Sequence, residues 1–314
     1  MICAGRRESG MGKYLLLGRG SIGRKHQSIL ESLGHTVVSV DPSPLAGADY
    51  KQAFSIECVP PWYKETKAGT DMLVVAWEDF DGVLDCTPAG AGIRAGWQIP
   101  AKARFIEKPL GGVPDRKGCN EPVQIGFCYR FLPSLQQFRE ALVDVRVFSL
   151  TMLAGAWLPD WHPDEDYRER YHGTPGVGGV VNDSLSHSLF IARWLLGELS
   201  VAGSIIGKLG GLDVSTEDTA ATLLRAATGQ PVYILVDYLR RPGDSTIEAV
   251  TSGGVKVWEM NPEEAPEMYR AQMETFVRVC ANEQRFGYPT LADGVAVQLL
   301  LDEVRNGEME ARYE

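Results

Sequence analysis

A glycine-rich turn between a predicted strand and a predicted helix is the feature that most restricts how this chain can fold. Residues 14–17 read YLLL, and Gly18-Arg19-Gly20-Ser21-Ile22-Gly23 follows directly, opening a helical pattern over residues 21–33. The next β-branched run, residues 37–40, ends at Asp41. This order of strand, turn, helix, strand and acidic residue predicts the first unit of a Rossmann domain.

Each glycine of the turn has a separate role in holding a dinucleotide. Gly18 allows the tight turn, Gly20 lets the backbone approach a pyrophosphate, and Gly23 allows the helix to pack closely on the strand. Ser21 and Ile22 begin the helix, whose free N–H groups and positive dipole end favour phosphate. The turn therefore predicts a dinucleotide site.

The choice of dinucleotide depends on Asp41. A carboxylate at this position accepts hydrogen bonds from the adenosine ribose and repels a 2′-phosphate, which favours NAD over NADP. Arg19 is a contrary indication because its guanidinium could reach a phosphate. The alternative interpretation is a glycine-rich turn without a ligand and a solvated Asp41.

Apolar runs continue through the first part of the chain, separated by segments long enough for crossovers. Parallel strands covered on both faces show this pattern. We therefore predict an NAD-binding Rossmann domain over residues 1–127, with residues 1–12 as a disordered tail. The further predicted strands are residues 72–75, 83–86, 104–106 and 123–127.

The remainder, residues 128–314, has the alternating pattern of an antiparallel sheet with Gly, Pro and Asp turns. The sequence thus predicts an α/β Rossmann domain followed by an α+β domain with an open, mainly antiparallel sheet. We expect this second domain to bind substrate and to form oligomers, and its C-terminal helix to pack back on the first. Its predicted strands are residues 145–154, 219–228, 231–239 and 246–258, and its predicted helices are residues 184–196, 265–282 and 291–305.

Composition excludes several other classes of protein. The formal net charge is -10 and no large Lys/Arg cluster occurs, so nucleic-acid binding is not expected. No apolar run approaches the ~18–20 residues that span a bilayer, so no membrane partner is expected. The 6 cysteines are scattered without a CxxC pair, which predicts no metal site and a cytoplasmic location.

Five segments together resemble the Gfo/Idh/MocA oxidoreductases. They are GRGSIGRKH at residues 18–26, DCTPA at 85–89, EKP at 107–109, GGVVNDSLSH at 178–187 and PTLADG at 289–294. The resemblance implies that Thr87, Pro88, Glu107 and Lys108 contact the cofactor, and that the peptide bond before Pro109 is cis. Residues 158–171 resemble the subgroup that acts on nucleotide-linked or sialic-acid-like sugars.

Lys108, Asp183 and His187 match the catalytic positions of that family. A histidine can accept the proton of a sugar hydroxyl near neutral pH as hydride leaves the same carbon. Lys108 would stabilise the alkoxide, and Asp183 would orient His187 or bind a substrate hydroxyl. The alternatives are a solvated Lys108, a structural or solvated His187, and an Asp183 that only caps a helix beside the equally good caps Asn182 and Ser184.

Aromatic residues and arginines in and near the 158–171 segment are candidates for substrate binding. Aromatic rings provide a stacking surface for sugars, and arginine clamps carboxylate or phosphate. The alternative is a surface loop with buried aromatic residues. The candidates are Arg130, Trp157, Trp161, Tyr167, Arg168 and Tyr171; His162 and His172 flank the segment.

The segment between Pro109 and Val123 departs from the family. It is too short and too rich in Gly and Pro for the helix that the family has there. The loss of that helix weakens the expectation of cofactor retention but not that of the fold.

Three functions remain open on the sequence alone. The first is an NAD-dependent oxidoreductase that acts on a hydroxyl or keto carbon of a sugar or sugar derivative. The second is an NAD-dependent glycosidase that oxidises its sugar only transiently, and the third is a non-catalytic dinucleotide-binding sensor. An open sheet of the kind implied by the family needs a partner, so a homodimer or homotetramer is expected.

Overall fold

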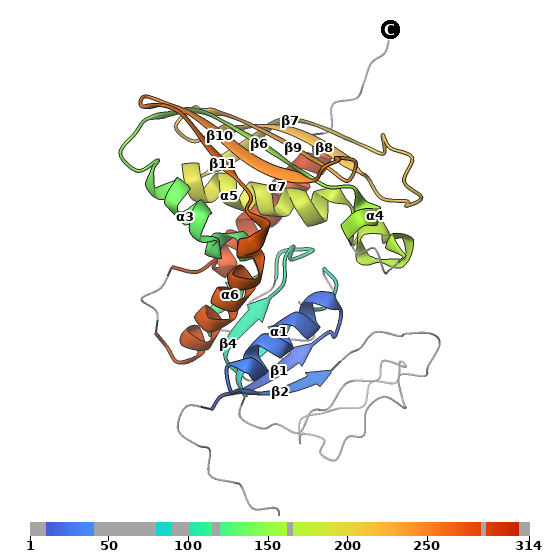
Figure 1. The fold of residues 1–314 in the computed structure, drawn as a ribbon, viewed down its shortest axis with the longest axis vertical. Helices are drawn as coiled ribbons and strands as arrows, with labels where there is room; N and C mark the ends of the chain where they lie inside the picture. The colour runs from blue at the N-terminus through green and yellow to red at the C-terminus, as the bar shows by residue number, and fades with distance from the viewer. Residues whose placement is uncertain are drawn as a thin grey trace, which may run out of the picture.

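The computed structural model describes residues 11–40, 80–89, 101–114, 120–161, 166–283 and 287–307. Asp41, the predicted strand at residues 72–75, His162 and residues 1–10 of the predicted tail lie outside the described residues. The described part forms two sheets, one in each lobe of the molecule (Figure 1).

The first sheet is parallel, with strand order β2-β1-β3-β4-β5. Helix α1 (Ser21–Ser32) connects the first two strands. Chain order reverses between β1 and β3, and open α/β sheets bind ligands at the carboxyl ends of strands at such a point. The strands are β1 (Lys13–Leu17), β2 (Thr36–Val40), β3 (Phe80–Asp85), β4 (Ala101–Ile106) and β5 (Val123–Ile125).

The second sheet is mixed, with strand order β11-β10-β6-β9-β8-β7. All its neighbouring pairs are antiparallel except β6 with β9. The two sheets confirm the predicted fold class, a Rossmann-like parallel sheet followed by a mainly antiparallel one. The strands are β6 (Val147–Gly155), β7 (Leu199–Gly207), β8 (Thr219–Ala226), β9 (Pro231–Asp237), β10 (Asp244–Thr251) and β11 (Gly254–Glu259).

Two details of the predicted second sheet were wrong. The single strand expected over residues 246–258 is a hairpin of β10 and β11, because Gly254 takes a φ of 99° at the turn. Strand β7 was not predicted at all. Its sequence LSVAGSIIG has only a weak alternation of apolar and polar residues, and its pairing with β8 places it.

Helices cover one face of the second sheet and fill the space toward the first (Figure 1). The apolar core is continuous from Ile125 and Phe127 at the end of the parallel sheet to Leu189 on α5 and Leu301 on α7. The helices of this layer are α3 (Pro133–Glu140), the short α4 (Leu158–Trp161), α5 (Ser186–Leu196) and α7 (Leu291–Asn306).

Helix α6 (Ala265–Cys280) returns to the parallel sheet and packs on it through Met273, Phe276 and Val279. Gly82 of β3 makes this approach possible, because a Cβ there would lie 2.7 Å from the Phe276 ring. The last helix, α7, begins with a Thr290–Asp293 capping box and packs close to β5, where a Cβ on Gly294 would lie 2.9 Å from Ile125. The chain therefore contacts the first sheet again after completing the second.

Candidate active site

The glycine turn after β1 has the shape that a bound phosphate requires. Gly18 has a φ of 88°, and a Cβ there would lie 2.7 Å from the Cys86 carbonyl oxygen. A Cβ on Gly23 would lie 2.0 Å from the Gly18 oxygen, so only glycine lets α1 start this close to the strand. No atom lies within 4 Å of the Cβ position of Gly20, and no acidic residue occupies the first turn of α1. The turn is closed toward the sheet and open toward the outside, which fits a dinucleotide pyrophosphate.

The segment after β3 forms a second wall beside that turn. The buried Asp85 carboxylate accepts hydrogen bonds from Thr87 N (3.0 Å) and Thr87 Oγ1 (2.6 Å), which fix the strand end. Burial raises the pKa of Asp85, and the two bonds from Thr87 oppose that rise. Pro88 follows and is exposed at the sheet edge.

The segment after β4 carries the next two predicted residues. The Lys108–Pro109 peptide bond is cis, as the family resemblance implied. Glu107 is joined to the fully buried His26 of α1, with 2.8 Å between Oε1 and Nε2. Glu107 also packs against Gly126, where a Cβ would lie 2.5 Å from its carboxylate. These contacts tie the Lys108 backbone to the helix that starts at the glycine turn.

Lys108 reaches across to the second lobe and binds Asp183. Its Nζ lies 2.8 Å from Asp183 Oδ1 and 3.0 Å from the Asp183 carbonyl oxygen. Both side chains are largely buried, with 11% and 16% exposed. The interpretation of Lys108 as merely solvated is therefore wrong in this structure, because the ammonium is held at the junction of the lobes.

Asp183 lies in a π-helical turn, Val181–Leu185, that runs directly into α5. The helix was expected to begin at residue 184, so its start was placed three residues late. Asp183 is inside the helical turn and is not an N-cap, and its carboxylate binds Lys108 instead of backbone N–H groups. π-Turns occur often at functional sites because they displace backbone carbonyls; here the Asp183 carbonyl accepts from Lys108 Nζ and Ser186 Oγ.

Two further side chains approach the other carboxylate oxygen of Asp183. Tyr238 Oη donates to Oδ2 at 3.4 Å, and His172 Nε2 lies 3.6 Å from the same oxygen. Burial by itself would raise the pKa of Asp183, but Lys108 and His172 outweigh it and lower that pKa to about 2. Asp183 is therefore ionised at neutral pH.

His187 follows one turn later and has an apolar environment. Its ring stacks on Tyr129 at 4.8 Å and meets Phe127 edge-on. Nδ1 is buried without a hydrogen-bond partner among the described residues. Burial and the nearby Lys108 ammonium hold the pKa of His187 well below its usual value, although Asp183 opposes this. His187 is thus a neutral imidazole, which suits a proton acceptor.

The structure brings only part of the predicted substrate set together. Trp161 and Tyr171 pack edge-on against His172, with ring centroids at 5.1 and 5.7 Å. The Tyr171 hydroxyl is buried and has no hydrogen-bond partner in the described part of the chain. These two aromatic residues therefore line the His172 side of the site.

The other members of the segment have protein partners of their own. The guanidinium of Arg241 stacks on Trp157 at 3.9 Å, and Tyr167 Oη accepts from Asp213 N at 3.2 Å. Arg168 is exposed and ion-paired with Asp166 and Asp213. In the part of the chain that the structure describes, none of these three side chains forms a hydrogen bond or ion pair with Lys108.

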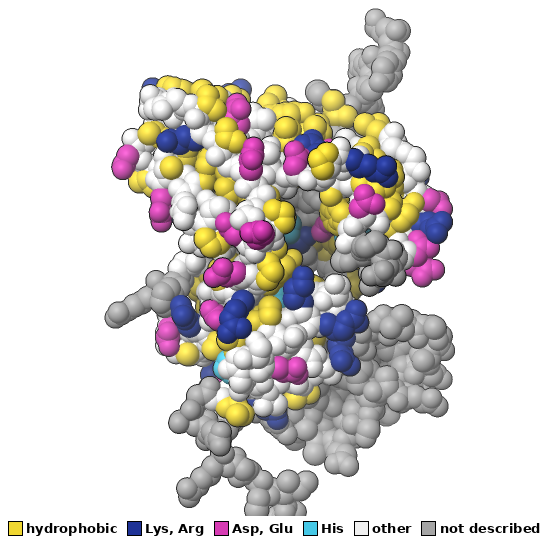
Figure 2. Space-filling view, viewed as in Figure 1, with side chains coloured by type: hydrophobic (Ala, Val, Ile, Leu, Met, Phe, Trp, Pro, Cys, Tyr) yellow, Lys and Arg dark blue, Asp and Glu magenta, His cyan; other side chains and the backbone are white. Residues whose placement is uncertain are grey.

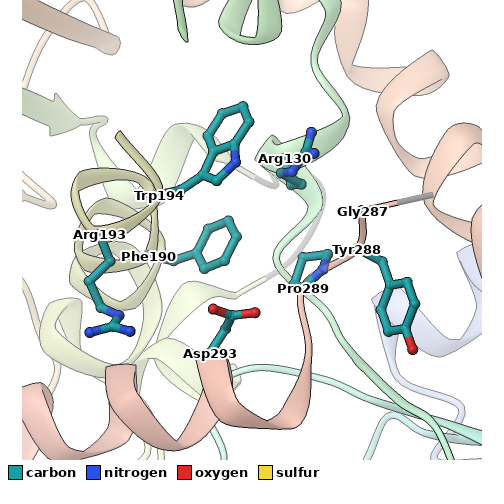
Figure 3. Close-up of a pocket in the computed structure, with 8 residues that line it drawn as sticks. All are labelled: Arg130, Phe190, Arg193, Trp194, Gly287, Tyr288, Pro289 and Asp293. Atoms are coloured by element: carbon teal, nitrogen blue, oxygen red, sulfur yellow. The ribbon is translucent and has the colours of Figure 1, made fainter. Parts of the chain in front are cut away.

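Arg130 lies in a separate hollow of about 160 Å³ (Figure 3). Its guanidinium stacks on Trp194 at 4.3 Å. Trp194 lies near the C-terminal end of α5, whereas His187 lies at the start of that helix. The lining residues are Arg130, Phe190, Arg193, Trp194, Gly287, Tyr288, Pro289 and Asp293. The structure therefore does not place Arg130 beside Lys108 and Asp183.

His172 and Tyr238 both approach the Asp183 carboxylate, and neither was among the predicted site residues. His172 had a weak signal, since it adjoins the 158–171 segment. Tyr238 had none, because its approach to Asp183 depends on how β9 ends beside the π-turn. The described residues contain no group of three side chains able to hold a metal ion, and no helix among them is long and apolar enough to cross a membrane.

The molecular surface is hollowed between the two lobes, and basic side chains lie beside the hollow (Figure 2). The exposed basic residues of the glycine turn and α1 are Arg19, Arg24 and Lys25. The fold and this site define a two-lobed protein with a Rossmann-like parallel sheet, a second, mainly antiparallel sheet, and a candidate active site at the junction of the lobes.

Comparison with known proteins relates part of the chain to a family. Residues 135–255 match the model described as GFO/IDH/MocA C-terminal domain. This match confirms, over those residues, the resemblance inferred from the sequence. Comparison with curated protein sequences gives no match.

Solved structures share the fold over nearly the whole chain. GenD2 from gentamicin A biosynthesis, in complex with NAD, is 17% identical with a TM-score of 0.69, covering 98% of this chain and 97% of GenD2. The WlbA dehydrogenase from Bordetella pertussis, in complex with NADH and UDP-GlcNAcA, is 18% identical with a TM-score of 0.69 and coverages of 95% and 96%. A myo-inositol dehydrogenase from Corynebacterium glutamicum is 18% identical with a TM-score of 0.64 and coverages of 95% and 98%.

Proposed function

We propose that this protein is an NAD-dependent oxidoreductase that transfers a hydride between nicotinamide and a hydroxyl or keto carbon of a sugar or sugar derivative. The observation that carries the proposal is the Lys108–Asp183 pair. It joins the carboxyl edge of the parallel sheet to the second lobe, at the same edge as the open glycine turn. A purely dinucleotide-binding sensor has no need for a buried ammonium and a neutral histidine at that junction.

The chain offers a distinct set of groups to the cofactor. The Gly18–Gly23 turn and the start of α1 would hold the pyrophosphate, and Thr87, Pro88 and Glu107 would line the path toward Lys108. The bound dinucleotide supplies the hydride acceptor or donor. The cofactor-bound structures of GenD2 and WlbA support NAD as that dinucleotide.

The remaining groups provide for the proton and the developing charge. The Lys108 ammonium would donate to the substrate oxygen and stabilise the alkoxide as hydride leaves the adjacent carbon. His187, neutral in its buried site, would accept the hydroxyl proton. Asp183, ionised at neutral pH, would hold Lys108 and offer an acceptor to a second substrate hydroxyl.

The finer substrate class we propose is a nucleotide-linked sugar. Two observations support it: the 158–171 segment and its aromatic residues, and the UDP-GlcNAcA bound in the WlbA structure. A screen of nucleotide sugars, sugar acids and inositols, followed by NADH absorbance, tests the proposal. Release of sugar without net NADH would show a glycosidase, and NAD binding without any turnover would favour a sensor.

We expect NAD to bind more tightly than NADP, and the difference to depend on Asp41. Replacing Asp41 by Ser removes the acceptor for the ribose hydroxyls and the repulsion of a 2′-phosphate, so NAD affinity should fall and the preference relax. Titration calorimetry with both dinucleotides measures this. Tighter binding of NADP to the unaltered protein would contradict the assignment.

The second sheet has an outer face that no described helix covers (Figure 1). Leu223, Tyr233 and Val257 expose 48%, 39% and 56% of their surface along one row of this face. Thr151 and Glu248 lie between Tyr233 and Val257 in this row, so polar side chains interrupt the apolar ones. Exposed apolar side chains on an uncovered sheet face favour an interaction surface, and we propose that a second copy of the chain covers it. A Leu223→Glu/Tyr233→Glu variant should then sediment at half the mass or less of the unaltered protein, with Lys208→Glu, on the loop after β7, as a charge-changing control. A monomeric unaltered protein would refute this.

A further inference from the structure

The two oxygens of the Asp183 carboxylate have different partners. Oδ1 accepts the short bond from Lys108 Nζ, at 2.8 Å. Oδ2 faces Tyr238 Oη at 3.4 Å and His172 Nε2 at 3.6 Å. An ionised carboxylate only accepts hydrogen bonds, so the facing His172 nitrogen must carry a hydrogen for the contact to be attractive.

His172 is held firmly in its place. Its carbonyl oxygen accepts hydrogen bonds from Gly179 N at 2.9 Å and Thr216 Oγ1 at 2.8 Å. The imidazole packs edge-on against Trp161 at 5.1 Å and Tyr238 at 5.9 Å, and 14% of the side chain is exposed. The ring therefore has little freedom to turn away from Asp183.

Tyr238 is fixed in the same way from the end of β9. Its side chain is completely buried, and its backbone N–H donates to the Asp218 carbonyl oxygen at 2.8 Å. The ring packs edge-on against Trp161 at 5.3 Å. Tyr238 Oη and His172 Nε2 thus both face Asp183 Oδ2, the oxygen that does not accept the short bond from Lys108.

We propose that His172 and Tyr238 are positioning residues that fix the Asp183 carboxylate and, through it, the Lys108 ammonium. A lysine ammonium is a compact charge on a flexible four-carbon stem, so its position depends on the acceptor that holds it. A carboxylate held by both oxygens keeps Oδ1 directed at Lys108. The 3.4 Å hydrogen bond from Tyr238 and the 3.6 Å contact with His172 can also shorten when substrate binds.

Three variants test this role in turnover, which rests on the proposed function. Tyr238→Phe removes one oxygen, His172→Phe keeps an aromatic ring in the cluster, and His172→Gln keeps an N–H near the position of Nε2. Both Phe variants should lose about 10- to 100-fold in kcat with KM changed less than about threefold, as expected for a misplaced reacting group. His172→Gln should recover part of the loss, and calorimetric NAD affinity should stay unchanged in all three.

A double-variant cycle separates positioning from a general structural effect. If His172 acts only through Asp183, then adding His172→Phe to Asp183→Asn should cost no further kcat, because effects of residues that act as a unit are not additive. An additive loss would overturn the proposal. So would a Tyr238→Phe variant with unaltered kcat and an unaltered Lys108 signal in the measurement below.

A readout without substrate keeps the proposal independent of the reaction. The side-chain ¹⁵Nζ resonances of lysine identify an ammonium held in a fixed pair, and Lys108→Arg assigns the signal of Lys108. We expect this signal in the unaltered protein and its broadening or loss in His172→Phe and Tyr238→Phe, with partial return in His172→Gln. If the signal responds but no sugar is oxidised, the proposed function fails and the positioning role stands. If sugars are oxidised but neither the Lys108 signal nor kcat changes in any of the three variants, the positioning role fails and the proposed function stands.

Discussion

Replacing Lys108 by Ala is expected to lower kcat by about 10²–10³-fold once a substrate is identified, because removal of one preorganised donor to a developing oxyanion typically costs that factor. The ammonium lies 2.8 Å from Asp183, and both groups are mostly buried, so solvent does not replace the lost charge. Steady-state NADH absorbance measures the effect.

Two controls distinguish lost chemistry from lost structure. Lys108→Met keeps the apolar length of the side chain and should be as slow as Lys108→Ala. Calorimetric NAD affinity should change little in either variant, since the glycine turn is not altered. A Lys108→Ala variant within a few-fold of the unaltered kcat would remove Lys108 from the alkoxide role.

Replacing His187 by Ala is expected to lower kcat by about 10²–10⁴-fold, the usual contribution of a general base. Its matched control is His35→Ala, because His35 Nδ1 accepts from Gly12 N near the amino end of β1, at the edge of the sheet opposite the glycine turn. The His35→Ala control should lower the free energy of unfolding but leave kcat unchanged. A His187→Ala variant that retains most of its kcat would leave the acceptor role to another group.

The pH dependence gives a second measure of His187. A base works in its neutral form, and a pKa well below the usual value means that the neutral form persists to lower pH. In the oxidation direction, kcat/KM should therefore rise with pH only below about 6.5, the ordinary histidine value, with no His187 inflection at that pH. A rising limb at or above pH 6.5 that disappears in His187→Gln would contradict the buried, neutral imidazole.

Local chemistry allowed much of the fold to be predicted from the sequence. Gly18 is required by its positive φ, and Gly23 is required because a Cβ there would lie 2.0 Å from the Gly18 oxygen. These constraints act between residues close in the sequence, so they leave a recognisable motif. Most strands and helices were located by periodicity, because each buries one face. The prediction failed where the pattern was weak, as in β7, or where a tight turn interrupted an apolar run, as between β10 and β11.

Motif resemblance made Lys108, Asp183 and His187 the candidate catalytic residues, but their arrangement was decided by tertiary structure. Lys108 and Asp183 are 75 residues apart, and they meet because β4 ends opposite a π-turn of the other lobe. Nothing in the spacing of the sequence showed that Asp183 would bind Lys108 and not cap a helix.

Tertiary structure also decided the contacts of Arg130, His172 and Tyr238. Arg130 lies in the 3₁₀ turn Cys128–Phe131 after β5, and its side chain turns to Trp194 and a different hollow. His172 and Tyr238 come from a loop and a strand end, and they share one carboxylate oxygen only because the second sheet packs on the helix that carries Asp183. The sequence by itself determined most of the elements, because propensity and glycine geometry are local, and motif resemblance supplied the candidate catalytic residues. Only the tertiary structure decided which of those side chains meet, because a hydrogen bond depends on distances that no spacing along the chain encodes.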